Sequence, residues 1–134
     1  MKRQQPERAG CILFFQRIRL HPETKHLPIF AIPNGGSRNI AEAANLKRMG
    51  VTAGVPDICC AIPQTVGYGT HLIHHGLWME AKCGATQPTI QQLAMIDLLR
   101  KHGYEARVIH GTTPVDLANN LWDCLRRYLN LMND

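Results

Sequence analysis

Two apolar segments that each carry charged residues at one end constrain this chain most. The first begins at Asp57, just after Gly54, Val55 and Pro56. The second spans residues 76–82 and has Glu80 and Lys82 near its end. We expect the two segments to form neighbouring strands, which brings the three charged side chains to one place. Residues two apart on a strand share a face, so Glu80 and Lys82 project to the same side.

Met79 and Ala81 then face the opposite side of the strand. Two carboxylates that converge can hold a hard divalent cation through oxygen ligands, and a Lys beside them can position or deprotonate a water or neutralise a phosphate. The pattern therefore predicts metal-assisted phosphodiester hydrolysis. Taken alone, Asp57 is also explained as a turn or cap residue after Pro56.

Chain length and charge limit what such a site can serve. With 134 residues, the chain suits one domain over residues 1–134. Its net charge of +5 favours a polyanionic partner. An excess of this size is also common among proteins that bind no nucleic acid.

The cysteines indicate a reducing compartment. They are odd in number and irregularly spaced, and no secretory signal precedes them, so we interpret them as reduced thiols in a soluble, intracellular protein. A zinc site with the nearby histidines is disfavoured because no CxxC or HxxxH pair is present. The apolar runs are too short to span a bilayer, and no membrane partner is expected. The residues weighed for zinc are Cys59, Cys60, Cys83, His71, His74 and His75.

The spacing of apolar residues, together with the Gly and Pro residues between segments, predicts eight elements in the order α, β, α, β, β, α, β, α. The fold class is α/β, with a central mixed sheet covered by helices on both sides. Residues 63–76 are expected to form a long loop that could lie over substrate. Expected helices are 6–20, 39–49, 89–102 and a last helix from Thr112 or Thr113 to Leu131, and expected strands are 27–32, 55–62, 76–82 and 104–110.

The helices are expected to bury apolar stripes against the sheet. For the second helix the stripe is Ile40, Ala43, Ala44 and Leu46; for the third it is Leu93, Ala94, Met95, Ile96, Leu98 and Leu99; for the last it is Val115, Leu117, Leu121, Trp122, Leu125 and Leu129.

Several polar residues outside the strand pair have two readings each. Glu7 is either a solvated first-turn acid or a third carboxylate for the metal, with Glu42 as its rival. Arg38 follows a Gly-rich turn that could cradle a phosphate or simply connect two elements, and the P-loop pattern is missing. Lys47 and Arg48 suit either the helix dipole or backbone phosphates of DNA.

The order of these motifs resembles a known family. Residues 50–57, then 80–82, then a helix that starts with Gln and ends at Gly103 and Tyr104 resemble the virus-type replication-repair nuclease (VRR-NUC) domain of the PD-(D/E)xK nuclease superfamily. Residues 31–36 also look like that family's approach to its motif. The resemblance covers essentially the whole chain, which is similar to the small stand-alone form found in phages and bacteria.

The resemblance implies a restriction endonuclease-like core and a set of site residues. It implies Mg²⁺ or Mn²⁺ bound by Asp57, Glu80 and the backbone carbonyl of Ala81, with Lys82 as the catalytic lysine. Glu7 matches the family's acidic residue in the first helix, which favours the metal-ligand reading over Glu42.

The family's helix glutamine matches Gln92 better than Gln91. However, residues 86–90 depart from the family's usual helix start, so the choice between the two stays open.

The activity implied is that of a metal-dependent DNA endonuclease, a hydrolase acting on branched DNA. Stand-alone relatives look like homodimers that resolve Holliday junctions in replication, recombination or repair, in the cytoplasm of a bacterium or a phage-infected host. A flap or nicking nuclease of the same fold is the alternative, and so is a nucleic-acid-binding module that has lost catalysis. A nucleotide-binding α/β protein is disfavoured because a GxGxxG turn after a strand is absent.

Overall fold

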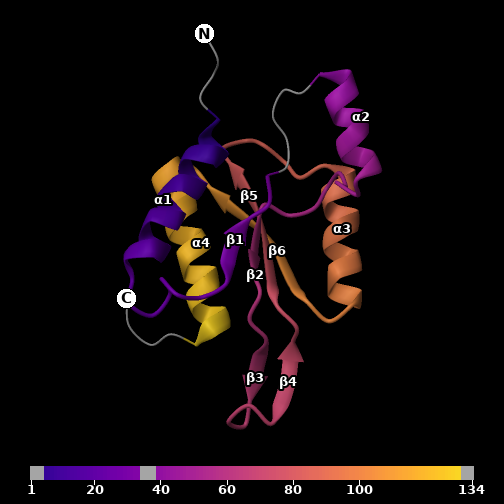
Figure 1. Cartoon of the computed structure of the whole chain (residues 1–134). Coiled ribbons are helices and arrows are strands. Elements are labelled where there is room, and N and C mark those ends of the chain that lie inside the picture. Colours follow the sequence, from indigo (N-terminus) through magenta and orange to yellow (C-terminus); the bar gives the residue numbers. More distant parts are fainter. Residues whose placement is uncertain (1–4, 34–38, 131–134) are drawn as a thin grey trace.

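The computed structural model describes residues 5–33 and 39–130 as helices on both sides of a small sheet (Figure 1). Within these residues, no helix is long and apolar enough to cross a membrane. The elements are α1 (Pro6–Leu20), β1 (Ile29–Ala31), α2 (Ile40–Arg48), β2 (Ile58–Cys60), β3 (Gln64–Val66), β4 (His71–His74), β5 (Leu77–Cys83), α3 (Ile90–Lys101), β6 (Glu105–Gly111) and α4 (Pro114–Leu129).

The main sheet is mixed, as the sequence predicts. Its strand order is β1-β2-β5-β6; β2 is antiparallel to both β1 and β5, whereas β6 runs parallel to β5. Helices α1 and α4 cover one face and α3 covers the other (Figure 1). Ile58 pairs with Met79, so Asp57 lies one residue beyond the last β2–β5 pair, beside the carboxyl half of β5.

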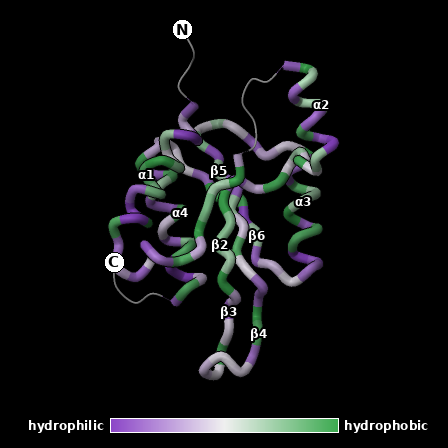
Figure 2. Tube along the Cα trace, viewed as in Figure 1, coloured by the Kyte–Doolittle hydropathy of each residue, from purple (hydrophilic) through white to green (hydrophobic). Residues whose placement is uncertain are grey.

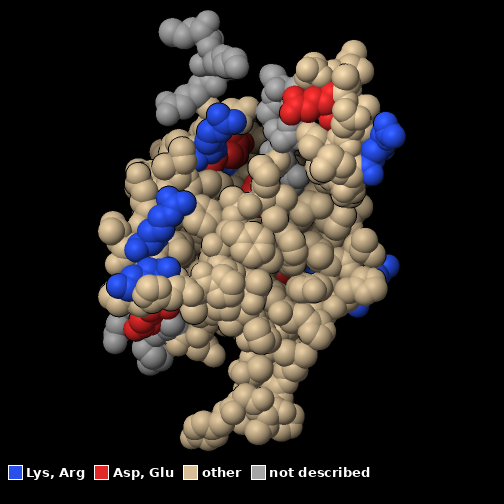
Figure 3. Space-filling model, in the orientation of Figure 1, with Lys and Arg blue, Asp and Glu red and all other residues tan. Residues whose placement is uncertain are grey.

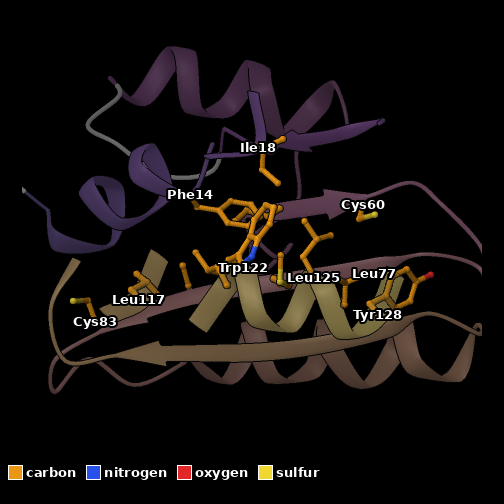
Figure 4. Packing of buried hydrophobic residues seen from close by; sticks show 13 residues of the cluster. Phe14, Ile18, Cys60, Leu77, Cys83, Leu117, Trp122, Leu125 and Tyr128 are labelled. Atoms are coloured by element: carbon orange, nitrogen blue, oxygen red, sulfur yellow. The ribbon is translucent and has the colours of Figure 1, made fainter. Parts of the chain in front are cut away.

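The main core lies between the sheet and the α1–α4 pair (Figure 4). From β5 it takes Leu77, Met79, Ala81 and Cys83, which confirms that Met79 and Ala81 face away from Glu80 and Lys82. Alternate residues of a strand reach opposite faces, so one strand serves core and site at once. Strand β2 adds Ile58 and Cys60. The helices supply the other large side chains, namely Phe14, Ile18, Leu117, Leu121, Trp122, Leu125 and Tyr128.

Each of the packed helices starts at a residue suited to a helix N-terminus. Pro6 occupies the first turn of α1, where a missing N–H is tolerated. The Thr113 side chain accepts from the N–H of Asp116 at the start of α4. Thr89 and Gln92 form a reciprocal capping box on α3. Local sequence therefore determines where these helices begin.

The outer edge of β6 is closed by side chains from the helices on either side. Arg100 Nε of α3 donates to the carbonyl of Ala106 at 2.9 Å, and Asn120 Nδ2 of α4 donates to the carbonyl of His110 at 2.7 Å. Both carbonyls lie on the edge that has no neighbouring strand. An incoming strand would have to displace these two bonds before it could pair with β6.

The predicted loop over residues 63–76 is wrong, because most of it forms the β3–β4 hairpin. This hairpin projects from the end of the molecule where β5 begins (Figure 1), and Gly67, Tyr68 and Gly69 adopt positive φ at its turn. It also displays none of the blue or red charged side chains (Figure 3). The hairpin lies at the opposite end of β5 from Glu80 and Lys82, so it does not cover them.

The expected burial of α2 is also wrong. None of its residues is buried, and the Ile40 side chain is 89 % exposed. Figure 1 shows why, since α2 stands beyond the end of α3 and off the sheet. Its alternation of polar and apolar residues is visible in Figure 2, but no element among the described residues covers the apolar positions.

The other apolar stripes are partly confirmed. On α3 only Ile96 is buried, whereas Leu93 and Leu98 are about half exposed because α3 covers a narrow strip of the sheet. On α4, Val115 is exposed and Leu129 is partly buried, while Tyr128 joins the core in addition to the predicted leucines and Trp122. Leu131, the predicted end of the last helix, lies outside the described residues.

Candidate functional site

Asp57 and Glu80 meet at the carboxyl half of β5, as the strand pattern predicts. The backbone N–H of Ala81 donates to Asp57 Oδ2 at 2.9 Å, which holds the Asp57 carboxyl against the strand. The two carboxyl groups are themselves hydrogen-bonded. A bond between two carboxyl groups requires a proton, so without a cation one of them is neutral.

Glu80 is the neutral partner. Only 2 % of its surface is exposed. Burial, followed by the hydrogen bond to Asp57 and the negative charge of Asp57, raises the pKa of Glu80 to about 9, while the Lys82 ammonium acts in the opposite direction. The protein thus keeps a proton between the partly buried Asp57 carboxyl group and the buried Glu80 carboxyl group, at a place where a divalent cation would replace the proton.

Lys82 shares the face of Glu80 and is buried, with 8 % of its surface exposed. Its charge is close enough to Glu80 to stabilise the ionised carboxylate. A buried ammonium is poorly solvated and therefore ready to pair with an anion. The lysine is placed to act on a phosphate or water held by the carboxylates.

A cleft of about 820 Å³ opens beside these residues, between α1 and β1. Glu7, Cys11 and Asp57 all line it, and the charges of Asp57, Glu80 and Glu7 together raise the pKa of Cys11 beyond the effect of its burial, to about 12. Red acidic surface is recessed at this end of the molecule beside a blue side chain (Figure 3). Glu7 therefore shares the cleft with Asp57.

Whether a metal ion fits this site depends on the donor atoms that the site provides. Within residues 5–33 and 39–130, no group of three or more His, Cys, Asp or Glu side chains is arranged to hold a metal ion. The protein ligands available are therefore the Asp57 and Glu80 carboxylates and a backbone oxygen. Mg²⁺ is usually bound by one or two carboxylates and keeps several waters, so this sparse oxygen set fits it.

Ala81 supplies the backbone oxygen. Its N–H points to the β2 side of β5, where it meets Asp57. The N–H and C=O of one strand residue point toward the same neighbouring strand, so the Ala81 carbonyl faces that side as well. Strand β2 pairs with β5 only as far as Met79, which leaves this carbonyl beyond the ladder.

Three helices begin at the same end of the sheet. Helices α3 and α4 each follow a strand that ends there, and α1 starts beside Asp57 (Figure 1). Helix N-termini carry partial positive charge and attract anions. The site therefore combines a carboxyl pair whose oxygens suit a cation with surroundings that favour a phosphate.

The glutamines of α3 have different places. Gln92 Oε1 accepts from the N–H of Thr89 at 2.8 Å and so closes the capping box. Gln91 is exposed, and its backbone carbonyl lies against Gly54 in the loop before Asp57. Gln92 thus has a structural role that the sequence analysis missed, although the spacing of Thr89 and Gln92 carries the signal for it.

The predicted DNA contacts are only partly within the described residues. Lys47 and Arg48 are exposed in the last turn of α2, which stands at the site's end of the molecule. Glu42 is exposed in the first turn of the same helix, and its charge is not among those that shift the pKa of Glu80. Arg38 lies outside the described residues.

The histidines weighed for the disfavoured zinc site lie away from the carboxyl pair. His71 and His74 belong to the hairpin, and His75 packs against Tyr104. The sequence analysis also missed Cys11 and the basic residues Arg8, Arg19 and Lys25, which line the cleft. Only the packing of α1 near β1 brings them there, and no motif marks them.

Comparison with known proteins supports the assignment of the fold. No protein-family model matches the sequence, and no curated protein is significantly similar to it. A solved structure described as a VRR_NUC domain protein superposes with a TM-score of 0.69, covers 99 % of this chain and 94 % of its own, and shares 26 % sequence identity. The chain has a VRR-NUC domain fold. The expected mixed sheet between helices is confirmed with it.

Proposed function

We propose that this VRR-NUC chain is a divalent-metal-dependent nuclease that hydrolyses phosphodiester bonds in DNA. The observation that carries the proposal is the hydrogen-bonded carboxyl pair formed by the partly buried Asp57 and the buried Glu80, with the buried Lys82 on the same strand face as Glu80. A structural role explains this arrangement poorly, because burying an acid and a lysine beside a second acid is unfavourable unless the group has a ligand to bind. The similarity to a VRR_NUC domain protein supports the same conclusion.

Asp57, Glu80 and the Ala81 carbonyl would hold Mg²⁺ or Mn²⁺. Such an ion supplies Lewis-acid polarisation of the scissile phosphate and lowers the pKa of a bound water. Asp57 is kept in place by the Ala81 N–H, and Glu80 must give up its proton to become a ligand. Glu7 lines the same cleft and would act on the ion through a water rather than as a third direct ligand.

Lys82 orients the attacking water and neutralises the negative charge that develops on the phosphate. Its burial strengthens this interaction, since the local dielectric is low. The Gln92 amide nitrogen, which the capping box does not use, would donate to a phosphate or water at the start of α3. Lys47 and Arg48 on α2, and Arg38, would contact the DNA backbone outside the catalytic centre.

In finer detail, the proposed activity is that of a junction-resolving endonuclease. It acts as a homodimer on branched DNA in replication, recombination or repair. A two-fold dimer presents two sites and suits symmetrical cuts in a four-way junction. The alternative of a flap or nicking nuclease is favoured by one observation, the cleft that leads away from Asp57 along α1. Sedimentation of a monomer at micromolar concentration would contradict the dimer.

The decisive experiment compares wild type with Asp57→Asn on labelled four-way junction, flap and linear duplex DNA, in Mg²⁺, Mn²⁺ or EDTA. We expect metal-dependent cutting by wild type and a loss of at least about 100-fold for the variant, because a ligand carboxylate is removed. Asp97→Asn is the matched control, since Asp97 is exposed on α3 and its side chain is 73 % accessible.

Thermal melts of both variants separate loss of activity from loss of fold. An Asp57→Asn protein that cuts at the wild-type rate would refute the site. Folded wild type that binds DNA but cuts none with either metal would instead support the catalytically silent binding module.

A further inference from the structure

The cleft beside the carboxyl pair extends far beyond it, along the whole length of α1. We call this feature the α1–β1 groove. Its walls are one face of α1, the connection to β1, and β1 itself. Glu7 and Asp57 lie at one end, and the lining continues through Arg8, Cys11, Ile12, Phe15, Ile18, Arg19, Lys25, Leu27 and residues 29–33.

We propose that the α1–β1 groove binds a single-stranded arm of the DNA substrate and leads it to the carboxyl pair. The inference rests on the proposed nuclease function. Because an intact four-way junction has only duplex arms, the inference selects the flap-nuclease alternative over junction resolution.

Charge is the first support. Arg8, Arg19 and Lys25 line the groove, and within the described residues none of them forms an ion pair with an acidic side chain. Figure 3 shows blue side chains spaced along the face over α1. Beyond the site's own acids, no Asp or Glu lines the groove. A row of unpaired cations that starts at a candidate phosphate-cutting centre is complementary to a nucleic-acid backbone.

The length of the row supports a strand of several nucleotides. Arg8 and Arg19 are eleven residues apart on α1, which corresponds to about 17 Å at 1.5 Å per residue. At about 3.4 Å per nucleotide, the spacing of one strand in a duplex, this distance spans roughly five nucleotides, and fewer in an extended strand. Lys25 continues the row beyond the end of the helix.

The apolar lining indicates unpaired bases. Cys11 and Phe15 are four residues apart, so they share one helix face, and Ile12 beside them is 53 % exposed. The Arg19 guanidinium lies 6.0 Å from the centre of the Phe15 ring, a cation over an aromatic surface. Base faces are available to such a surface only in single strands, since base stacking covers them in a duplex.

Strand β1 contributes backbone donors. It is an edge strand, and residues 28 and 32 bond to the β2 side through the Pro28 carbonyl and the Ile32 N–H. Residues of the opposite parity point away from β2, so the Ala31 N–H faces outward at the groove. This open edge could also accept a peptide strand, but the cations along α1 favour an anion over a peptide.

The test measures anisotropy of labelled duplex DNA with and without a single-stranded arm, in EDTA, over a range of salt concentrations. The variant is Arg19→Glu/Lys25→Glu, neither residue belonging to the catalytic centre. Lys101→Glu/Arg127→Glu is the control, because both residues are exposed in last helical turns outside the groove.

We expect wild type to bind the armed duplex more tightly than the blunt one. Each single-strand phosphate contact contributes about 0.7 to the slope of log K against log salt, so losing two contacts lowers the slope by about 1.4 and the affinity by about 25-fold at 0.1 M salt. The control pair should change armed and blunt binding alike and only slightly. Equal binding of both duplexes by wild type, or equal effects of the two variants, would overturn the proposal.

Photocrosslinking locates the arm directly. Iodouracil placed in the arm should crosslink to α1 or β1, whereas crosslinks confined to other elements would overturn the proposal and leave the β1 edge to a peptide partner. Cleavage is scored separately. Wild type that prefers arms but cuts no DNA in Mg²⁺ or Mn²⁺ refutes the nuclease and keeps the groove; wild type that cuts while the groove variant retains its arm preference refutes the groove alone.

Discussion

Replacing Glu80 with Gln tests whether the carboxyl pair is held together by a proton. Glu80 has a raised pKa in the fold, about 9 against an ordinary 4.5. An acid whose pKa is higher in the folded state stabilises the fold fully below its unfolded pKa, and that contribution is lost as pH rises through the folded value. Without metal, the Glu80 contribution therefore declines from about pH 4.5 to pH 9.

Glu80→Gln cannot titrate and retains a similar shape, so it should lack this decline. At 1.36 kcal/mol per pKa unit, protonating Glu80 at pH 7 costs wild type about 3 kcal/mol relative to pH 4.5. Between pH 4.5 and pH 7, the stability of the variant relative to wild type should therefore increase. For a domain of this length the increase corresponds to roughly 10 °C in melting temperature. Glu80 is almost fully buried, so solvent screening reduces this value little.

The assay is thermal unfolding followed by circular dichroism from acid to alkaline pH, with EDTA and then with Mg²⁺. In EDTA, the difference between variant and wild type should grow as pH rises. Added Mg²⁺ at ten times its Kd should stabilise wild type by about 1.4 kcal/mol, increasingly at high pH, and should not stabilise the variant. Parallel pH profiles of the two proteins in EDTA would show that Glu80 titrates normally and refute the reasoning.

Two stability comparisons follow from the packing. Leu121→Ala removes a fully buried side chain from the main core and should lower the free energy of unfolding by about 2–5 kcal/mol in urea denaturation, whereas Ile40→Ala should change it by less than about 0.5 kcal/mol because Ile40 is 89 % exposed. A large loss of unfolding free energy in Ile40→Ala would mean that α2 packs against another part of the protein. Gly54→Ala should destabilise by about 1–3 kcal/mol and reduce cutting, since Gly54 has φ +89 and a Cβ there would lie 2.5 Å from the Gln91 carbonyl. Unchanged melting of Gly54→Ala would contradict the close contact between this loop and α3.

The parts of the site that the sequence predicts are those set by strand alternation. The spacing within residues 76–82 puts Glu80 and Lys82 on one face, and the expected pairing of the two strands adds Asp57. The bounds of α1 are predicted well because Pro6 and Pro22 mark its two ends. The shared face and the helix bounds each have a signal within a few residues of the feature.

The rest depends on tertiary packing. An amphipathic pattern says which face of α2 is apolar, but not that α2 projects beyond the sheet, so the burial of Ile40 was predicted wrongly. The β3–β4 hairpin was not predicted because its turn spans four residues around Tyr68 and its strands are only three and four residues long. The α1–β1 groove depends on the separation of two elements, which no local pattern encodes.

The closed edge of β6 makes the two edges of the main sheet unequal. Arg100 and Asn120 occupy the carbonyls through which another strand would join on that side, whereas β1 on the other side remains open. Among the described residues, extension of the main sheet by a second molecule, the first step of many aggregation reactions, is therefore favoured at the edge that borders the proposed DNA path. Bound substrate would cover that edge, so nucleic acid should act as a solubility factor for this protein, and the free chain should be the form most prone to self-association.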